Sequence, residues 1–215
     1  MLLTWVLLAA TTGTAAAAVP TGEIAPATAL EAPHSLRSGL VVGLAFGAGL
    51  GGASGYPNDI NRIGDPNAYS ASGWMVGSSE SLFVMGALTD YLNVGFFFNQ
   101  AAFGNHNWHS RGSSGGLRIE AFPLALGYPS FAGLGILAQF GIGGANLTSR
   151  IPGLPEANGT QSFAAAGAFY EWPFWHVLGG HFAAGPSLDF EATWSQPFER
   201  HGLFVSGRLA FCGGP

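Results

Sequence analysis

Charged side chains are scarce in this chain of 215 residues, where Asp, Glu, Lys and Arg together make up 9%. Ordinary globular domains contain roughly a quarter charged residues. Lysine is absent, so all seven basic residues are arginine. Because the formal net charge is −5 and the arginines form no basic patch in the sequence, we expect no nucleic acid to bind.

Cysteine is nearly absent as well. The single Cys212 cannot form an internal disulfide and matches no metal-binding spacing, so we expect a free thiol, no metal site and no cofactor. The chain contains 34 Gly and 13 Pro, and because each glycine inside a helix costs about 1 kcal/mol relative to alanine, this composition argues against a helical bundle. With 48% hydrophobic residues, it favours a protein that lies in lipid as β-strands.

The N-terminal segment has the features of an export signal. Residues 2–10 are apolar, and small residues follow as far as Ala18. A membrane anchor is the alternative, but the apolar run is shorter than the ~20 residues that a spanning helix needs. We therefore expect a signal peptide at 1–18 and a periplasmic linker at 19–37. Since no later segment has the length of a spanning helix, a membrane protein with this sequence must be a closed barrel.

Large apolar residues alternate with small or polar ones in six segments, at a length that suits membrane strands of ~9–11 residues. These segments are 39–50, 93–103, 115–124, 131–146, 179–194 and 202–211. In each of them, every charge lies on the face opposite the large aliphatic residues, so Leu44 and Ile136 are expected to face lipid. Two weaker strands are expected at 80–89, whose inward face the pattern does not fix, and at 161–172. Pro186 is expected to cause a local bulge.

The expected connections alternate between long and short, which is the arrangement of bacterial outer-membrane barrels. The long ones are 51–79, 104–114, 147–160 and 195–201, and the short ones are 90–92, 127–130 and 173–177. Aromatic residues near the expected strand ends, Trp108 among them, suggest interfacial girdles. We therefore predict an all-β fold: an eight-stranded antiparallel up-and-down transmembrane β-barrel at 38–211, with a C-terminal tail at 212–215.

The predicted barrel resembles the small OmpA/OmpX-type outer-membrane barrels. The resemblance rests on the segments GLVVGLAFGAGL, LTDYLNVGFFF and GLFVSGRLAF. It implies localisation in the cell outer membrane, contact with outer-membrane lipid, and recognition of a terminal aromatic residue by the barrel-assembly machinery. Phe211 is the candidate for that residue, although four residues follow it.

An eight-stranded barrel has an interior just wide enough for side chains, so a general pore is not expected. The inward polar residues are Asn99, Arg118, Glu120, Gln139, His181, Asp189, Glu191 and Arg208. We interpret them as a structural network in which charges are paired, because an unpaired buried charge is costly. A narrow polar path or a proton-transfer set is the alternative.

The expected hairpins predict particular partners within this network. Asn99 should lie opposite Arg118, and Gln139 opposite Glu120. Arg208 should pair with Asp189, or with Glu191 if the register differs by one step.

The sequence favours a structural or surface-binding protein, with 51–79 and 147–160 as contact surfaces for an unidentified ligand. A lipid-modifying barrel enzyme of the lipid-A deacylase kind is the alternative, because His106, His109 and Ser110 share one expected outer loop. Such a mechanism needs the nucleophile, the base and an orienting group within reach of one another, and adjacent His109 and Ser110 offer no evident third group. We therefore expect no enzyme. A soluble lipocalin-like barrel is disfavoured because it would be apolar inside and polar outside.

Overall fold

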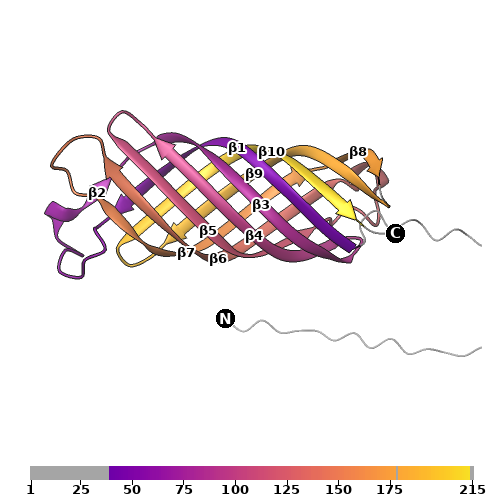
Figure 1. Ribbon diagram of the computed structural model, residues 1–215, viewed down its shortest axis with the longest axis horizontal. Coiled ribbons are helices and arrows are strands. Elements are labelled where there is room, and N and C mark those ends of the chain that lie inside the picture. The colour runs from indigo at the N-terminus through magenta and orange to yellow at the C-terminus, as the bar shows by residue number, and fades with distance from the viewer. Residues whose placement is uncertain (1–38, 178, 214–215) are drawn as a thin grey trace, which may run out of the picture. The chain divides into compact units, whose positions relative to one another are not determined.

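The computed structural model describes residues 39–177 and 179–213, so the predicted signal peptide and linker lie outside the described residues. Antiparallel strands make up most of the described chain (Figure 1). The strands are β1 (Gly39–Gly55), β2 (Ser70–Ala71), β3 (Met75–Thr89), β4 (Leu92–Gly104), β5 (Trp108–Ala121), β6 (Leu134–Ser149), β7 (Ala157–Tyr170), β8 (Trp172–Val177), β9 (Gly180–Trp194) and β10 (Phe198–Gly213). Two short 3₁₀ helices, η1 (Pro66–Ala68) and η2 (Pro129–Phe131), complete the elements.

The sheet closes on itself because β1 pairs with β10 as well as with β3. β8 continues β7 along the same edge of β9, and β2 is a short side strand on β1. The result is the predicted eight-stranded antiparallel barrel. β2 and η1 lie at one end of the barrel and β8 at the other (Figure 1); we refer to these as the β2 end and the β8 end.

The register fixes the stagger of the barrel. A path that starts at Val41 and follows directly paired residues from strand to strand returns to β1 at Gly51. One circuit therefore advances ten residues along β1, from 41 to 51. Such a stagger requires strands that are steeply tilted from the barrel axis, as Figure 1 shows.

The predicted faces are confirmed by the exposure of the side chains. On β1, Phe46 is 56% exposed and Leu50 51%, whereas Ala45 is 8% exposed. Ile136 on β6 is 52% exposed. The structure also fixes the face that the sequence left open, because Phe83 of β3 is buried inside. A closed barrel with an apolar outer surface satisfies its backbone internally and is a transmembrane barrel.

Among the described residues, no helix has the length and hydropathy that crossing a membrane requires.

The eight strands that close the barrel, which are all but β2 and β8, have 13 to 17 residues and so exceed the ~9–11 residues typical of membrane strands. The predicted loop 104–114 is mostly strand, and only 105–107 form its turn. Asn105 closes this turn, because its side-chain oxygen accepts hydrogen bonds from the backbone N–H groups of Asn107 and Trp108. Trp108 is buried in the interior and does not belong to an aromatic girdle. At the C-terminus, β10 continues to Gly213, two residues beyond the predicted end of the barrel.

Pro186 lies beside an interruption of the sheet. The β9–β10 register passes Pro186 without a shift, so the bulge expected in this strand is absent there. On the other side, pairing of β9 with β7 ends at Ser187, and the register with β8 shifts after Pro173. A Cβ on Gly185 would overlap the carbonyl oxygen of Tyr170, so glycine is needed where the interrupted strand approaches. The proline has no N–H to donate and is tolerated where the ladder is broken.

Candidate functional site: the polar lumen

The interior of the barrel is filled by side chains in layers. An apolar cluster occupies the β2 end and consists of Ala53, Met75, Ala101, Phe103, Trp108, Leu147, Ala157, Phe198 and Phe204. A second apolar cluster extends from the middle towards the β8 end and consists of Val41, Phe83, Met85, Phe97, Phe163, Ala165, Ala210 and Cys212. A third, towards the β8 end, consists of Phe122, Leu137 and Phe169. Buried polar side chains lie among these clusters.

Four charged residues meet in what we call the Glu120 layer: Arg118 and Glu120 of β5, Arg208 of β10, and Glu171 between β7 and β8. The Arg208 guanidinium donates to both oxygens of Glu120, with Nη2 2.9 Å from Oε2, and its Nε lies 2.6 Å from Oε1 of Glu171. Arg118 Nε donates to Glu120 Oε1 at 2.7 Å. All four side chains are buried, and Glu120 has no exposed surface. The layer has two positive and two negative charges, each in contact with an opposite one.

Aromatic rings hold the two arginines of the Glu120 layer in place. The guanidinium carbons of Arg118 and Arg208 both lie 4.3 Å from the centre of the Phe83 ring. Arg208 also lies 4.3 Å from the centre of the Phe169 ring. Cation–π contacts of this kind stabilise a guanidinium most where water is excluded.

Nearer the β2 end, Ser79, Asn99, Glu191 and Arg200 form a second set, which we call the Glu191 layer. Asn99 Nδ2 donates to Glu191 Oε1 at 2.7 Å, and the Ser79 hydroxyl donates to the same oxygen at 3.3 Å. Arg200 packs over the Phe103 ring, with 4.8 Å between the guanidinium carbon and the ring centre. Its Nε and Nη2 are buried without a hydrogen-bond partner in the described part of the chain. Two cavities of about 10 Å³ each border both Glu191 and Arg200, and each has room for about one water molecule.

The structure corrects the predicted partners. Arg208 pairs with Glu120 and Glu171 across the lumen, and neither Asp189 nor Glu191 forms the predicted ion pair with it. In the β9–β10 register Arg208 lies opposite Gly185, because the strands meet in a turn at 195–197 that is tighter and differently centred than expected. Asp189 instead accepts a hydrogen bond from the Ser187 hydroxyl at 2.9 Å.

The two other predicted alignments are wrong for a similar reason. Asn99 lies opposite Ser114 rather than Arg118, since β4 and β5 extend into the expected loop and turn at 105–107. Gln139 lies opposite Arg118 rather than Glu120. Gln139 is nevertheless buried and inward, as predicted.

His181 lies outside both layers. It is on the inward row of β9 at the β8 end, where its ring is 5.8 Å from that of His176 and its register partner is Cys212. The predicted network therefore divides into the Glu120 layer, the Glu191 layer and separate positions at Gln139, His181 and Asp189.

Three members of these layers were not predicted: uncharged Ser79, and the charged residues Glu171 and Arg200. Arg200 falls in the expected loop 195–201, but it has the same even numbering as inward Arg208 on β10. Glu171 continues the odd inward row that includes Phe169 on β7. Glu171 lies inside the expected strand 161–172, and Arg200 lies two residues before the expected strand 202–211, so following the two inward rows would have found both charged residues.

The residues considered for catalysis are not brought together. Ser110 is buried, and its hydroxyl donates to the carbonyl oxygen of Asn146. His109 precedes it on β5 and lies on the outward row, because successive residues of a strand point to opposite faces. Within residues 39–177 and 179–213, His, Cys, Asp and Glu form no group of three or more that could hold a metal ion.

No protein-family model matches this chain, and a search of curated proteins finds no match. Among solved structures, the chain is similar to Ail, the attachment invasion locus protein of Yersinia pestis, with a TM-score of 0.45 and 12% identity over 80% of this chain and 99% of Ail. It is also similar to the N-terminal β-barrel domain of Pseudomonas aeruginosa OprF, with a TM-score of 0.38 and 16% identity over 80% of this chain and 98% of that domain. The P. aeruginosa outer-membrane protein OprG is similar with a TM-score of 0.33 and 8% identity, covering 83% of this chain and 98% of OprG.

Proposed function

We propose that this protein is an outer-membrane barrel with a closed lumen, which acts as a structural or surface-binding protein through its connections at the β2 end. In this proposal it is exported, inserted by the barrel-assembly machinery and surrounded by outer-membrane lipid. It takes no cofactor and catalyses no reaction.

The filled lumen is the observation that carries the proposal. A hydrated ion that entered at the β2 end would meet Phe103, Trp108 and Phe204, which are at most 9% exposed. It would then have to displace the buried ion pairs of Arg208 with Glu120 and Glu171. Both steps are costly, because the first removes water from an ion and the second leaves buried charges without partners.

The connections at the β2 end support a binding surface. The connection after β1 is held by pairing of β2 with β1 and by a hydrogen bond of 2.6 Å from the Ser70 hydroxyl to the carbonyl oxygen of Pro155. Pro155 belongs to the connection between β6 and β7, so the two segments predicted as contact surfaces form one platform. Asp65 caps η1 within this platform by accepting from the N–H of Asn67 at 2.9 Å.

Conductance across a planar bilayer tests the closed lumen. With the purified wild-type protein inserted, we expect no stepwise current above that of the bare membrane, while a general porin in the same membrane gives steps. Reproducible steps from the wild-type protein would contradict the proposal.

Trypsin treatment of intact cells tests the exposure of the platform. Trypsin cleaves after arginine and lysine, and this chain has no lysine. Arg62, in the connection between β1 and β2, has a side chain that is 60% exposed. We expect cleavage after Arg62 in intact cells, and loss of that cleavage in an Arg62→Gln variant. Cleavage there only after the outer membrane has been permeabilised would show that the platform faces the periplasm.

A further inference from the structure

Two histidines lie opposite each other in the hairpin that β8 and β9 form at the β8 end. His176 of β8 is directly paired with His181 of β9, and their ring centres lie 5.8 Å apart. The short connection 178–179 joins the two strands, and Gly179 in it has a φ of +71°, a left-handed conformation that glycine adopts readily. Because a short connection fixes the register of a hairpin, the two imidazoles are held next to each other.

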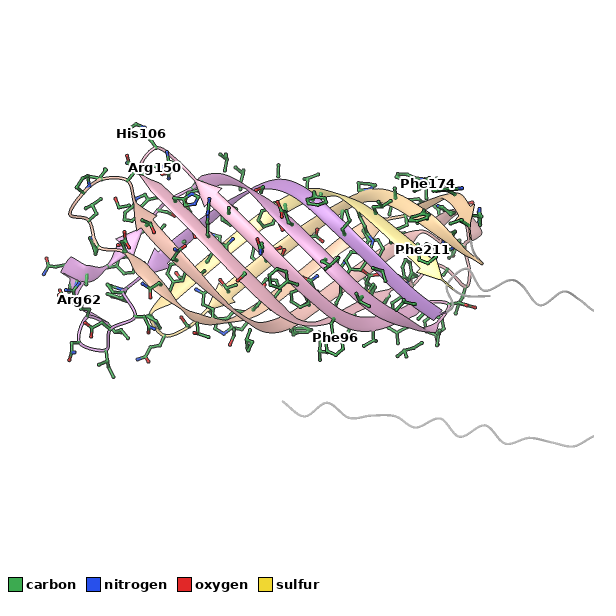
Figure 2. The ribbon with its side chains drawn as sticks, in the orientation of Figure 1. Arg62, Phe96, His106, Arg150, Phe174 and Phe211 are labelled. Carbon is green, nitrogen blue, oxygen red and sulfur yellow. The ribbon has the colours of Figure 1, made fainter. Side chains whose placement is uncertain are left out.

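Aromatic side chains on the outer surface attach this hairpin to the barrel wall. Trp175, which is 59% exposed, stacks on Phe182 of β9 with 5.5 Å between the ring centres. Phe182 in turn contacts Phe211 of β10, with 5.1 Å between the ring centres, and Figure 2 shows Phe211 at this end of the barrel. Since successive residues of a strand point to opposite faces, the neighbouring residues His176 and His181 lie on the inner face.

Solvent reaches these two histidines more readily than the rest of their row. His176 is exposed and His181 is half-buried. The row continues from His181 to Cys212 of β10 and then to Val41 of β1. Cys212 is 4% exposed and Val41 1%. A small solute can therefore reach the two imidazoles at the end of the barrel, whereas the thiol beyond them is covered.

The separation of the two rings suits the coordination of one metal ion. The distance from a metal ion such as Zn²⁺ to an imidazole nitrogen is about 2.0–2.1 Å. Two imidazoles that each direct one nitrogen at the same ion therefore hold their ring centres about 5–6 Å apart, depending on the angle at the metal. The separation of 5.8 Å between the rings of His176 and His181 lies within this range.

We propose that His176 and His181 together bind one divalent transition-metal ion, of the class of Cu²⁺, Zn²⁺ and Ni²⁺, at the β8 end. Neutral imidazole is the commonest protein ligand of such ions. Ca²⁺ and Mg²⁺ are excluded because they prefer oxygen ligands. The site has two protein ligands and water at its other positions, since His, Cys, Asp and Glu form no larger metal-binding group in the described part of the chain.

A metal ion bound to both histidines joins β8 to β9 close to the place where the sheet is interrupted. Direct pairing of β7 with β9 ends at Ser187, and the register of β8 with β9 shifts after Pro173. The ion adds a link between β8 and β9 beyond this interruption. A binding surface at the β2 end requires no metal ion, so the site is additional to the proposed function, and no reaction is assigned to it.

Titration with Cu²⁺ tests the site, with the full untagged chain folded in detergent micelles. Cys212 is replaced by Ser so that Cu²⁺ cannot oxidise the thiol. His176→Asn and His181→Asn should each weaken binding of the first Cu²⁺ by at least about 100-fold, because a single imidazole lacks the advantage of two linked ligands. His201→Asn, which changes an exposed histidine on the outward row of β10, should leave it unchanged. Unchanged affinity in either His176→Asn or His181→Asn would overturn the proposal.

The double variant tests whether the two histidines bind the same ion. His176→Asn combined with His181→Asn should bind Cu²⁺ no more weakly than either single variant, because each single change already destroys the shared site. Two separate sites would behave differently, since each single variant would lose one of two bound ions and the double variant would lose both. That second pattern would contradict the proposal.

Chemical protection tests the same site without any substitution, so the result does not depend on whether a variant folds. Diethyl pyrocarbonate acylates accessible imidazoles, and mass spectrometry of peptides locates the modified residues. In the folded wild-type protein, saturating Zn²⁺ should prevent acylation of both His176 and His181, while His201 continues to react and Ca²⁺ protects none of the three. If Zn²⁺ protects only one of His176 and His181, or neither, the two rings merely pack against each other and the proposal is wrong.

Discussion

In the Glu120 layer every charged side chain contacts an opposite charge, whereas in the Glu191 layer the carboxylate is held by the neutral groups of Asn99 and Ser79. Arg208 uses three nitrogens in hydrogen bonds. Arg200 leaves two buried nitrogens without a partner in the described chain, next to cavities of about 10 Å³. Similar residues inside one barrel therefore have different consequences: the first layer connects strands through charge, and the second offers places for water.

Of the substitutions in the two layers, Glu120→Gln should lower the free energy of unfolding the most. The amide removes the negative charge that both Arg118 and Arg208 contact, and it leaves one buried arginine without a counter-charge. We expect the free energy of unfolding in lipid vesicles to fall by about 3–5 kcal/mol, measured by denaturant titration with the folded barrel scored on gels. A loss below about 1 kcal/mol would mean that the Glu120 layer is not the stabilising one.

The same substitution in the other layer should cost less. In Glu191→Gln the amide oxygen still accepts from Asn99, and no ion pair is lost because Arg200 does not contact the carboxylate. We expect a loss of about 1 kcal/mol in the same titration. An effect equal to that of Glu120→Gln would show that the two layers are energetically alike.

Arg200→Met should have the smallest effect. It removes a guanidinium in which two nitrogens lack protein partners, together with its cation–π contact with Phe103, and places an apolar side chain in the same space. We expect a change of less than about 1 kcal/mol in either direction, because replacing a poorly satisfied buried polar group by an apolar one of similar shape is nearly neutral. A loss of several kcal/mol would indicate that Arg200 has partners, such as ordered water, that stabilise the barrel.

The period-two pattern was sufficient to predict the fold and the inward faces, because successive residues of a strand point to opposite faces of the barrel wall. Leu44, Ile136 and Arg208 were placed on the correct faces for this reason. The pattern could not locate strand ends: polar residues such as His109 and Ser110 suggested a loop, although strands that extend beyond the lipid carry polar residues on both faces. The turn at 105–107 was therefore not predicted, and the predicted register of β4 with β5 was wrong as a result.

The partners of Arg208 could not be predicted from the expected register of the hairpin that contains it. Its ion pairs cross the lumen to Glu120 on β5 and Glu171 after β7, rather than running to the neighbouring strand. In a narrow barrel long side chains reach across the interior, so contacts depend on the stagger of the whole sheet as well as on adjacent strands. The stagger follows from all the registers together, and no single hairpin gives it.

A pair of double-mutant cycles on Arg208 tests the account most directly, with the free energy of unfolding as the readout. Combining Arg208→Met with Glu120→Leu should be less destabilising than the sum of the single changes by about 2–3 kcal/mol, because each single change leaves the other member of this contact buried and the double variant contains neither member. The loss of the Arg118–Glu120 and Arg208–Glu171 contacts is already counted in the single changes. Combining Arg208→Met with Asp189→Leu should be additive within about 0.5 kcal/mol. If the coupling is found with Asp189 and not with Glu120, the cross-lumen network described here does not hold the barrel together.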